Sequence, residues 1–246
     1  MNALIEHIKK QTTGLSPVEA LRHLADTYPG GVVFSTSFGW EDQVITHMIF
    51  ANNIPIKVFT LETGRLFPET YYVWNRTLEM YGKPIHAYYP DAESLQQMVS
   101  AKGPNSFYES VDNRKECCHI RKIEPLKRAL AGNQCWITGI RAEQSANRQF
   151  MSDVEWDEGN KLVKFHPIYG WDLDEVKQYI RENNVPYNTL HDRGFPSIGC
   201  APCTRAVQPG EDFRAGRWWW EDQSKKECGL HSADVIDEET KELKPL

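Results

Sequence analysis

The chain has 246 residues, of which 40% are hydrophobic and 25% charged, as is ordinary for a globular protein that buries a core. Its net charge of −6 argues against a protein that binds nucleic acid non-specifically over a basic surface. No run approaches the roughly 20 apolar residues of a membrane span, and the N-terminal stretch MNALIEHIKKQTTG lacks the basic and apolar regions of a secretory signal. We therefore expect a cytoplasmic protein with no membrane or nucleic-acid partner.

The chain alternates between predicted strands and helices up to about residue 196. Ser16, Pro17 and Glu19 have the pattern of a helix start with a capping box, and Asp172 and Glu175 repeat it. Short buried strands are predicted at residues 31–39, 56–61, 84–90 and 134–140. Helices are predicted at residues 41–50, 67–81, 93–101 and 114–130, the last of them bent at Pro125.

This alternation predicts an α/β fold with a mostly parallel sheet and helices on both faces. In such folds ligands bind beyond the carboxyl ends of the strands, which selects the loops at 35–39, 62–65 and 139–148. The periodicity is lost from about residue 197. We therefore divide the chain into an α/β body, 1–196, and a C-terminal segment, 197–246, within one structural domain.

Two cysteine pairs are the most informative feature of the sequence. In a reduced compartment they are expected to be metal ligands or catalytic groups rather than disulfides. Cys117 and Cys118 form one pair, and Cys200 and Cys203 the other. Four thiolates suit an iron–sulfur cluster or a tetrahedral zinc ion, and adjacent cysteines suit a single ion poorly. The residues alone leave a cluster, a zinc site and structural or redox thiols open.

The loops after the first two strands carry groups that could bind a phosphate. Ser35, Ser37, Phe38 and Gly39 stand before a helix whose N-terminus favours anions. A tight polar turn with one cation follows the second strand and consists of Thr63, Gly64 and Arg65. Neither loop is a Walker or dinucleotide-binding motif, and an ordinary strand–helix turn explains each of them equally well.

The C-terminal segment combines two arginines with a further thiol. Arg214 and Arg217 are three residues apart, so in a helical turn both would face one side and suit phosphate or sulfate oxygens. Cys228 follows in the stretch KKECGLH, which ends at His231. Nearby cations lower the pKa of a thiol, so an arm that docks Cys228 against the arginines would create a nucleophile. The alternative is a stray cysteine on a frayed tail.

Together these motifs resemble the assimilatory adenylyl-sulfate reductases, the iron–sulfur branch of the phosphoadenylyl-sulfate reductase family. The resemblance extends from about residue 31 to residue 231. It rests on SFGWED, LETGRLFPETY, KECCHIRKIEPLKRAL, GCAPCTRAVQPGEDFRAGRWWW and KKECGLH, in the family's order and spacing. It implies an adenine nucleotide α-hydrolase-like fold in which residues 1–196 bind the adenylyl nucleotide and residues 197–246 carry the catalytic arm.

The resemblance also implies an activity and the residues that perform it. Cys117, Cys118, Cys200 and Cys203 would hold a 4Fe–4S cluster. Cys228 would attack the sulfur of adenosine 5′-phosphosulfate and release AMP, and thioredoxin would then release sulfite from the Cys228 S-sulfonate, in sulfate assimilation. Residues around the substrate would include Lys122, Arg214, Arg217 and His231, with Arg141 in a substrate loop.

Two residues need comment against the family's pattern, and three alternative functions remain. Glu62 stands where the family more often has Asp, and Cys135, in an apolar strand, is expected to be a buried small hydrophobe. Family members that prefer the 3′-phosphorylated substrate generally lack the two cysteine pairs, and use of both substrates stays open. An ATP pyrophosphatase would carry paired glycines that the loop at 35–39 lacks. A zinc-binding module leaves Cys228 and the nucleotide loops without a role. The oligomeric state stays open, a homo-oligomer included.

Overall fold

The computed structural model describes residues 2–144 and 151–221. A six-stranded sheet in the order β3-β2-β1-β4-β6-β5 forms its centre, and only β5 runs antiparallel to its neighbour. This confirms the predicted mostly parallel α/β fold. The strands are β1 (Val32–Ser35), β2 (Lys57–Leu61), β3 (His86–Tyr88), β4 (Cys135–Ile137), β5 (Val154–Asp157) and β6 (Leu162–Phe165).

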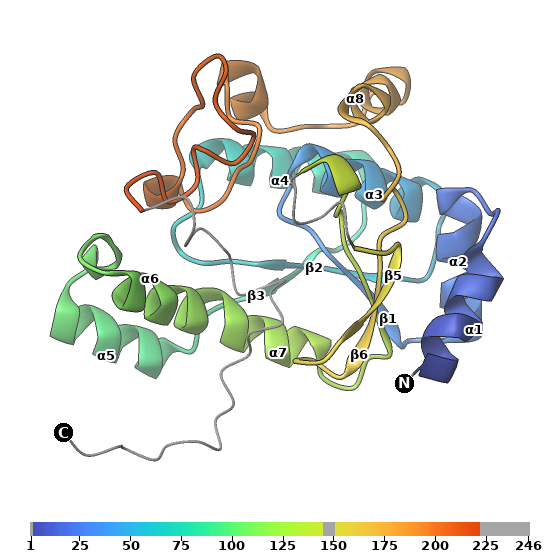
Figure 1. Ribbon diagram of the computed structural model, residues 1–246, viewed down its shortest axis with the longest axis horizontal. Coiled ribbons are helices and arrows are strands. Elements are labelled where there is room, and N and C mark those ends of the chain that lie inside the picture. The colour runs from blue at the N-terminus through green and yellow to red at the C-terminus, as the bar shows by residue number, and fades with distance from the viewer. Residues whose placement is uncertain (1, 145–150, 222–246) are drawn as a thin grey trace.

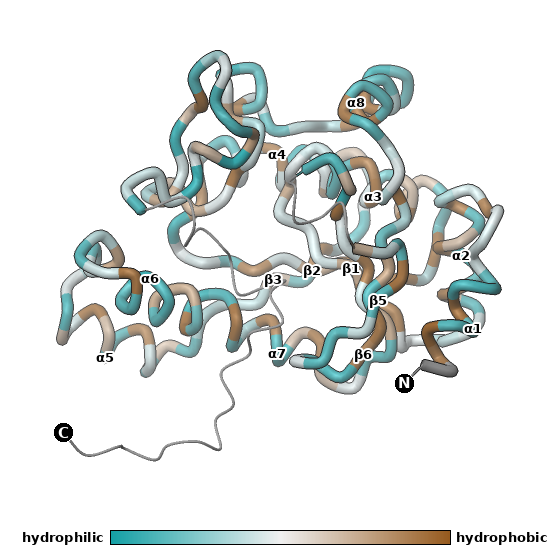
Figure 2. Tube along the Cα trace, viewed as in Figure 1, coloured by the Kyte–Doolittle hydropathy of each residue, from teal (hydrophilic) through white to brown (hydrophobic). Residues whose placement is uncertain are grey.

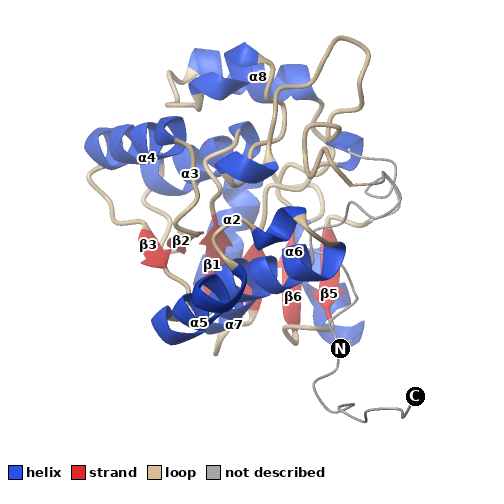
Figure 3. Cartoon of the chain, turned by 90° about the vertical axis from the view of Figure 1, so that its left-hand side faces the viewer, coloured by secondary structure: helices blue, strands red, loops and turns tan. Residues whose placement is uncertain are grey.

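Helices lie on both sides of the sheet (Figure 1). On one side are α3 (Trp40–Ala51), α4 (Pro68–Tyr81) and α8 (Leu173–Glu182), and beside them α1 (Asn2–Thr12) and α2 (Pro17–Thr27). On the other side are α5 (Ala92–Lys102), α6 (Val111–Cys118) and α7 (Glu124–Leu130). Figure 3 shows the same layers from the side, with the strands between the two groups of helices.

The period-two pattern of the strands supplies a core to each layer. Phe34 of β1 packs with the helices of one side, whereas the preceding Val33 packs with α7 on the other. Trp136 and its neighbours in β4 alternate in the same way. Figure 2 shows the apolar segments along the strands and on the helices that cover them. No helix in the described ranges has the length and apolar character needed to cross a bilayer.

Local signals in the sequence were reliable guides to helix starts. Ser16 with Glu19 and Asp172 with Glu175 each form the predicted capping box at α2 and α8. The predicted helix at 114–130 is instead two α-helices joined by a π-helical turn, His119–Ile123. Pro125 has no amide hydrogen to donate to the preceding turn, which fits a change of hydrogen-bond pattern at this point.

Residues 197–221 form no α-helix and no strand of the sheet. A 3₁₀ turn, Ala201–Cys203, and a bridge between Thr204 and Arg217 give this segment its shape. The amide of Trp218 donates to the carbonyl of Cys203, and that of Ala201 to the carbonyl of Arg65. These bonds hold the segment over the carboxyl ends of the strands, where ligands bind in such folds.

Candidate active site

A cleft of about 230 Å³ opens at the carboxyl ends of β1, β2 and β4. It is framed by the loops after those strands, by the π-turn and by the C-terminal segment. Eight of the predicted substrate residues line it, namely Ser35, Ser37, Phe38, Gly39, Thr63, Lys122, Arg214 and Arg217. Gly64, Arg65 and Arg141 lie outside its wall. Cys228 and His231 lie outside the described residues.

The loop after β1 is held by an internal carboxylate. Asp42 accepts hydrogen bonds from both the backbone N–H and the hydroxyl of Ser37, each at 2.6 Å. The expected phosphate donors of Ser37 are therefore engaged within the loop. Phe38 has a φ of 61°, which is uncommon for a bulky residue, and its amide donates to the hydroxyl of Thr36 at 3.1 Å. Strained backbone of this kind concentrates at functional sites.

Ser35 is oriented by a neighbouring strand. The indole N–H of Trp136 donates a hydrogen bond to the Ser35 hydroxyl oxygen at 2.8 Å. Since Ser35 is the acceptor in this bond, its hydroxyl can still donate its own proton to another group. Trp136 itself lines the cleft and carries the Lys164 ammonium over its ring at 5.1 Å. Trp136 was not selected from the sequence, because nothing local connects β4 to the end of β1.

The loop after β2 links the cleft to the cysteines. The Thr63 hydroxyl lies 3.3 Å from the Cys200 sulfur, and the Thr63 carbonyl accepts from the Arg121 guanidinium. Gly64 has a φ of 70°, which a side chain would strain. Arg65 turns away from the cleft, donates to the Asn105 side chain at 3.2 Å and lies over the ring of Phe107.

All four predicted cysteine ligands line a second, smaller cavity beside the cleft. Cys117 and Cys118 end α6, while Cys200 precedes the 3₁₀ turn and Cys203 ends it. Phe107 and Trp218 pack with the buried Cys200 and Cys203, and the partly buried Cys117 packs against this cluster. Within the described ranges, no group of three or more His, Cys, Asp or Glu side chains is arranged around one metal-ion position. The fifth thiol, Cys135, is fully buried in β4 with the helices of the opposite layer, as expected.

The thiols differ in their electrostatic surroundings. Burial raises the pKa of Cys203 to about 12 and raises that of Cys117, which Arg121 opposes in part. For Cys200 burial also favours the thiol. The Lys122 ammonium and the Thr63 hydroxyl outweigh burial there, so the pKa of Cys200 lies below its usual value. Cations therefore favour a thiolate at the cysteine that lies between the two cavities.

The π-turn carries two consecutive cationic side chains that lie beside the cysteines and the cleft. Lys122 lines both cavities, and Arg121, 6% exposed, donates to Thr63 and acts on Cys117. A π-helical turn changes the angle between successive side chains and is frequent at functional sites. Arg121 is not among the predicted site residues, because a π-turn leaves no local pattern that distinguishes it from an α-helix.

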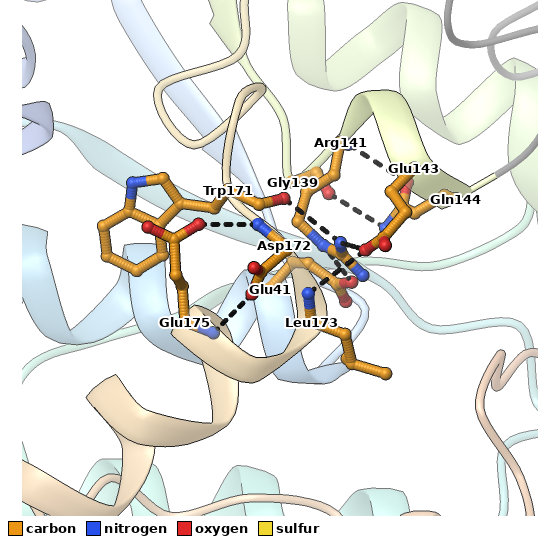
Figure 4. Close-up of polar contacts among 9 residues, drawn as sticks. All are labelled: Glu41, Gly139, Arg141, Glu143, Gln144, Trp171, Asp172, Leu173 and Glu175. Atoms are coloured by element: carbon orange, nitrogen blue, oxygen red, sulfur yellow. Dashed lines mark hydrogen bonds and ion pairs between the residues drawn. The ribbon is translucent and has the colours of Figure 1, made fainter.

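Arg141, predicted as a substrate residue, is engaged inside the protein. Its side chain is 1% exposed and forms an ion pair with Glu41 at 2.9 Å. A second nitrogen donates to Glu143 and to the Trp171 carbonyl, which connects the loop after β4 to the start of α8 (Figure 4). In the described part of the chain this guanidinium therefore positions three elements around the cleft rather than facing into it.

The Arg217 guanidinium packs closely against the backbone of Gly199, which has no side chain. Its guanidinium lies over the Trp218 ring at 4.9 Å, and a Cβ at Gly199 would lie 2.3 Å from one of its nitrogens. Its amide donates to the Arg214 carbonyl three residues earlier, as the predicted turn requires. Both arginines line the cleft, and Arg217 also lines the cysteine cavity.

Comparison with known proteins gives the family of the chain. Residues 31–206 match the model of the phosphoadenosine phosphosulfate reductase domain. An adenosine 5′-phosphosulfate reductase from Allochromatium vinosum is 52% identical over 200 residues, which cover 81% of this chain and 78% of that protein. A protein of the same name from Agrobacterium fabrum is 50% identical over 204 residues, covering 83% and 78%.

Solved structures agree with this. Phosphoadenylyl-sulfate reductase from Candida auris, in a phosphate complex, has a TM-score of 0.70 at 32% identity, covering 82% of this chain and 96% of that one. FMN adenylyltransferase from Candida glabrata, with FAD and inorganic pyrophosphate, reaches 0.52 at 14% identity, covering 89% and 78%, and shares the fold alone. The fold is adenine nucleotide α-hydrolase-like, as expected, and the chain belongs to the phosphoadenosine phosphosulfate reductase family.

Proposed function

We propose that this protein reduces adenosine 5′-phosphosulfate to sulfite and AMP, with Cys228 as the nucleophile and thioredoxin as the reductant. One observation carries the proposal: the cleft and the four-cysteine cavity share a wall that includes Lys122, Cys200 and Arg217. The name of the relatives at about 50% identity supports the choice of substrate. The protein is then an oxidoreductase that acts on a sulfur group.

The shared wall suits the charged end of the substrate. Attack of a thiolate on a sulfate group brings negative charges together, so cations must be in place where charge accumulates. Lys122 and Arg217 supply them on the wall shared with the cysteine cavity, and Arg214 lines the same cleft. Arg217 is 7% exposed and is held by stacking on Trp218, so it needs little reorganisation to bind an oxyanion.

The cysteine cavity fits a 4Fe–4S cluster held by Cys117, Cys118, Cys200 and Cys203. The donor set is four thiols that face one cavity, and buried aromatic rings cover it. Bound there, the cluster would add its charge and polarisable sulfur atoms next to the sulfate end. Arg121 and Lys122 would offset the negative charge of the ligands.

The proposed reaction balances in two steps. The Cys228 thiolate attacks the sulfur of the substrate, an S–S bond forms, the bond from sulfur to the phosphate oxygen breaks, and AMP leaves with that electron pair. A thioredoxin thiolate then attacks Cys228 Sγ of the S-sulfonate, and sulfite leaves. The second thioredoxin thiol resolves the mixed disulfide, so Cys228 regains its thiol while thioredoxin becomes a disulfide.

A direct assay tests this function. Sulfite release is measured with thioredoxin and either adenosine 5′-phosphosulfate or its 3′-phosphorylated form. We expect the unphosphorylated substrate to be consumed far faster, and the Cys228→Ser variant to release no sulfite. Equal rates would favour a dual-specificity enzyme and a reversed preference would favour the 3′-phosphorylated substrate. No sulfite from either would refute the proposal.

A further inference from the structure

A buried polar atom in the cleft wall has no partner among the described residues. His191 is 7% exposed and lines the cleft, and its Nε2 is buried without a hydrogen bond. Most buried polar atoms in folded proteins are paired, so an unpaired ring nitrogen in a cleft wall calls for an explanation. A ligand in the cleft would supply one.

The other ring nitrogen fixes which partner Nε2 requires. Nδ1 of His191 lies 2.7 Å from the carbonyl oxygen of Phe195. A carbonyl oxygen only accepts, so the proton is on Nδ1 and Nε2 of the neutral ring carries a lone pair. Burial lowers the pKa of His191 to about 4, which keeps the ring neutral near pH 7. Nε2 is therefore an acceptor that lacks a donor.

Two kinds of contact hold the His191 ring in this orientation, stacking on its face and hydrogen bonds of the turn that carries it. It stacks on Trp40 with centroids 3.8 Å apart and an interplanar angle of 15°. The turn that carries it begins at Asn188, whose side-chain carbonyl accepts from the Leu190 amide and whose side-chain amide donates to Thr70. Rotation of the ring would break the stacking on Trp40 and the hydrogen bond to Phe195.

The charged residues near the His191 ring differ from those at the cationic end of the cleft. Those that act on His191 belong to Glu41, Asp192 and Lys177, whereas Lys122 and Arg217 act on Cys200. A phosphosulfate group has no donor to offer, because its oxygens only accept at neutral pH. The donors of an adenylyl substrate are its ribose hydroxyls and its adenine amino group.

We propose that Nε2 of His191 accepts a hydrogen bond from the nucleoside part of the substrate and contributes to nucleotide specificity. This inference rests on the proposed function, because the donor is assigned from the chemistry of an adenylyl substrate. A ribose hydroxyl and the adenine amino group are the two sources of that donor. A ligand with a phosphate in place of the hydroxyl would set an anion against the lone pair and would be disfavoured.

Binding of the product AMP tests the inference apart from catalysis. Dissociation constants are measured by calorimetry for AMP, 2′-deoxy-AMP, 3′-deoxy-AMP and nebularine 5′-monophosphate, which lacks the amino group. The protein is used as wild type and as His191→Phe, which keeps a ring on Trp40 but removes the acceptor. His47→Phe is the matched control, since His47 also contacts a neighbouring ring but lies outside the cleft wall.

We expect one analogue to bind the wild type and His47→Phe about tenfold more weakly than AMP. That analogue identifies the donor, and in His191→Phe its penalty should vanish. Equal penalties in all three proteins would overturn the inference while leaving the proposed function intact. If the wild type bound no AMP, the proposed function would fall, and this inference with it.

A second measurement serves if His191→Phe does not fold. In wild-type protein labelled with ¹⁵N at histidine, AMP should move the Nε2 resonance of His191 without protonating it. The analogue that lacks the donor should leave that resonance nearly unchanged. An Nε2 resonance that ignores AMP would contradict the proposal.

Discussion

Arg114 and Glu221 form a buried two-pronged ion pair between α6 and the last described residue. The distances are 3.0 and 2.9 Å, and the two side chains are 2% and 4% exposed. Arg114 also lies over the Trp218 ring at 4.8 Å. The pair fastens the C-terminal segment to the helix that ends in Cys117 and Cys118. Since Cys228 is seven residues beyond Glu221, the chain between them spans at most about 25 Å.

Removal of one partner should destabilise the protein strongly. Glu221→Gln leaves the Arg114 charge buried and uncompensated, and we expect the free energy of unfolding to fall by about 3 kcal/mol. Urea denaturation measures this free energy of unfolding. The control is Arg76→Ala, which breaks an exposed pair with Glu79 and should cost less than about 1 kcal/mol. Similar losses in the two variants would contradict a specific role for the buried pair, and Arg114→Met with Glu221→Leu should recover much of the loss.

A methyl group at Gly199 should disturb catalysis more than folding. A Cβ there would lie 2.3 Å from a guanidinium nitrogen of Arg217, and the flexible end of that side chain can move aside. We expect Gly199→Ala to lower kcat/KM for adenosine 5′-phosphosulfate about tenfold, because the cation leaves its position. Gly170→Ala is the control, since a Cβ there meets nothing within 4 Å. Unchanged kinetics in Gly199→Ala would show that the position of Arg217 is not critical.

The buried imidazole of His191 should make stability depend on pH. Burial lowers its pKa from 6.5 to about 4, so between these values the unfolded chain binds a proton that the native protein does not. The free energy of unfolding therefore rises with pH across this window, and the contribution, up to about 3 kcal/mol, is lost as pH falls toward 4. Urea denaturation of the wild type and His191→Phe near pH 5 and pH 7 should give a smaller difference for the variant. Equal differences would mean that His191 titrates normally in the native state.

Iron content distinguishes the cysteines by position. We expect the protein purified without oxygen to be brown and to lose visible absorbance and iron on Cys117→Ser, Cys118→Ser, Cys200→Ser or Cys203→Ser. Cys135→Ala should keep both, because this thiol is buried in β4 away from the cavity. A colourless wild-type protein that contains zinc would support a zinc site in place of the cluster.

Features set by neighbouring residues could be predicted from the sequence, and features set by distant ones could not. The capping boxes of α2 and α8 depend on residues three apart and were predicted. The hairpin of β5 and β6 was missed, because each of its strands is only four residues long. The helix α1 at the N-terminus was also not predicted.

The site shows the same division. The cysteine pairs could be selected because their types and spacing are unusual, and the cavity they share is consistent with that selection. His191 could not, because its role depends on Trp40, which is 151 residues earlier in the chain. The family resemblance alone places Arg141 in a substrate loop. The structure instead pairs its guanidinium with Glu41, which no local pattern foretells.

Mass spectrometry of the Cys228 peptide tests the proposed mechanism most directly. The protein is incubated with adenosine 5′-phosphosulfate and no reductant, then digested and analysed, with Cys228→Ser as the control. We predict a sulfonate on Cys228, in an amount equal to the AMP released, which thioredoxin removes as sulfite. AMP release without this adduct, or a sulfonate on another cysteine, would contradict the account.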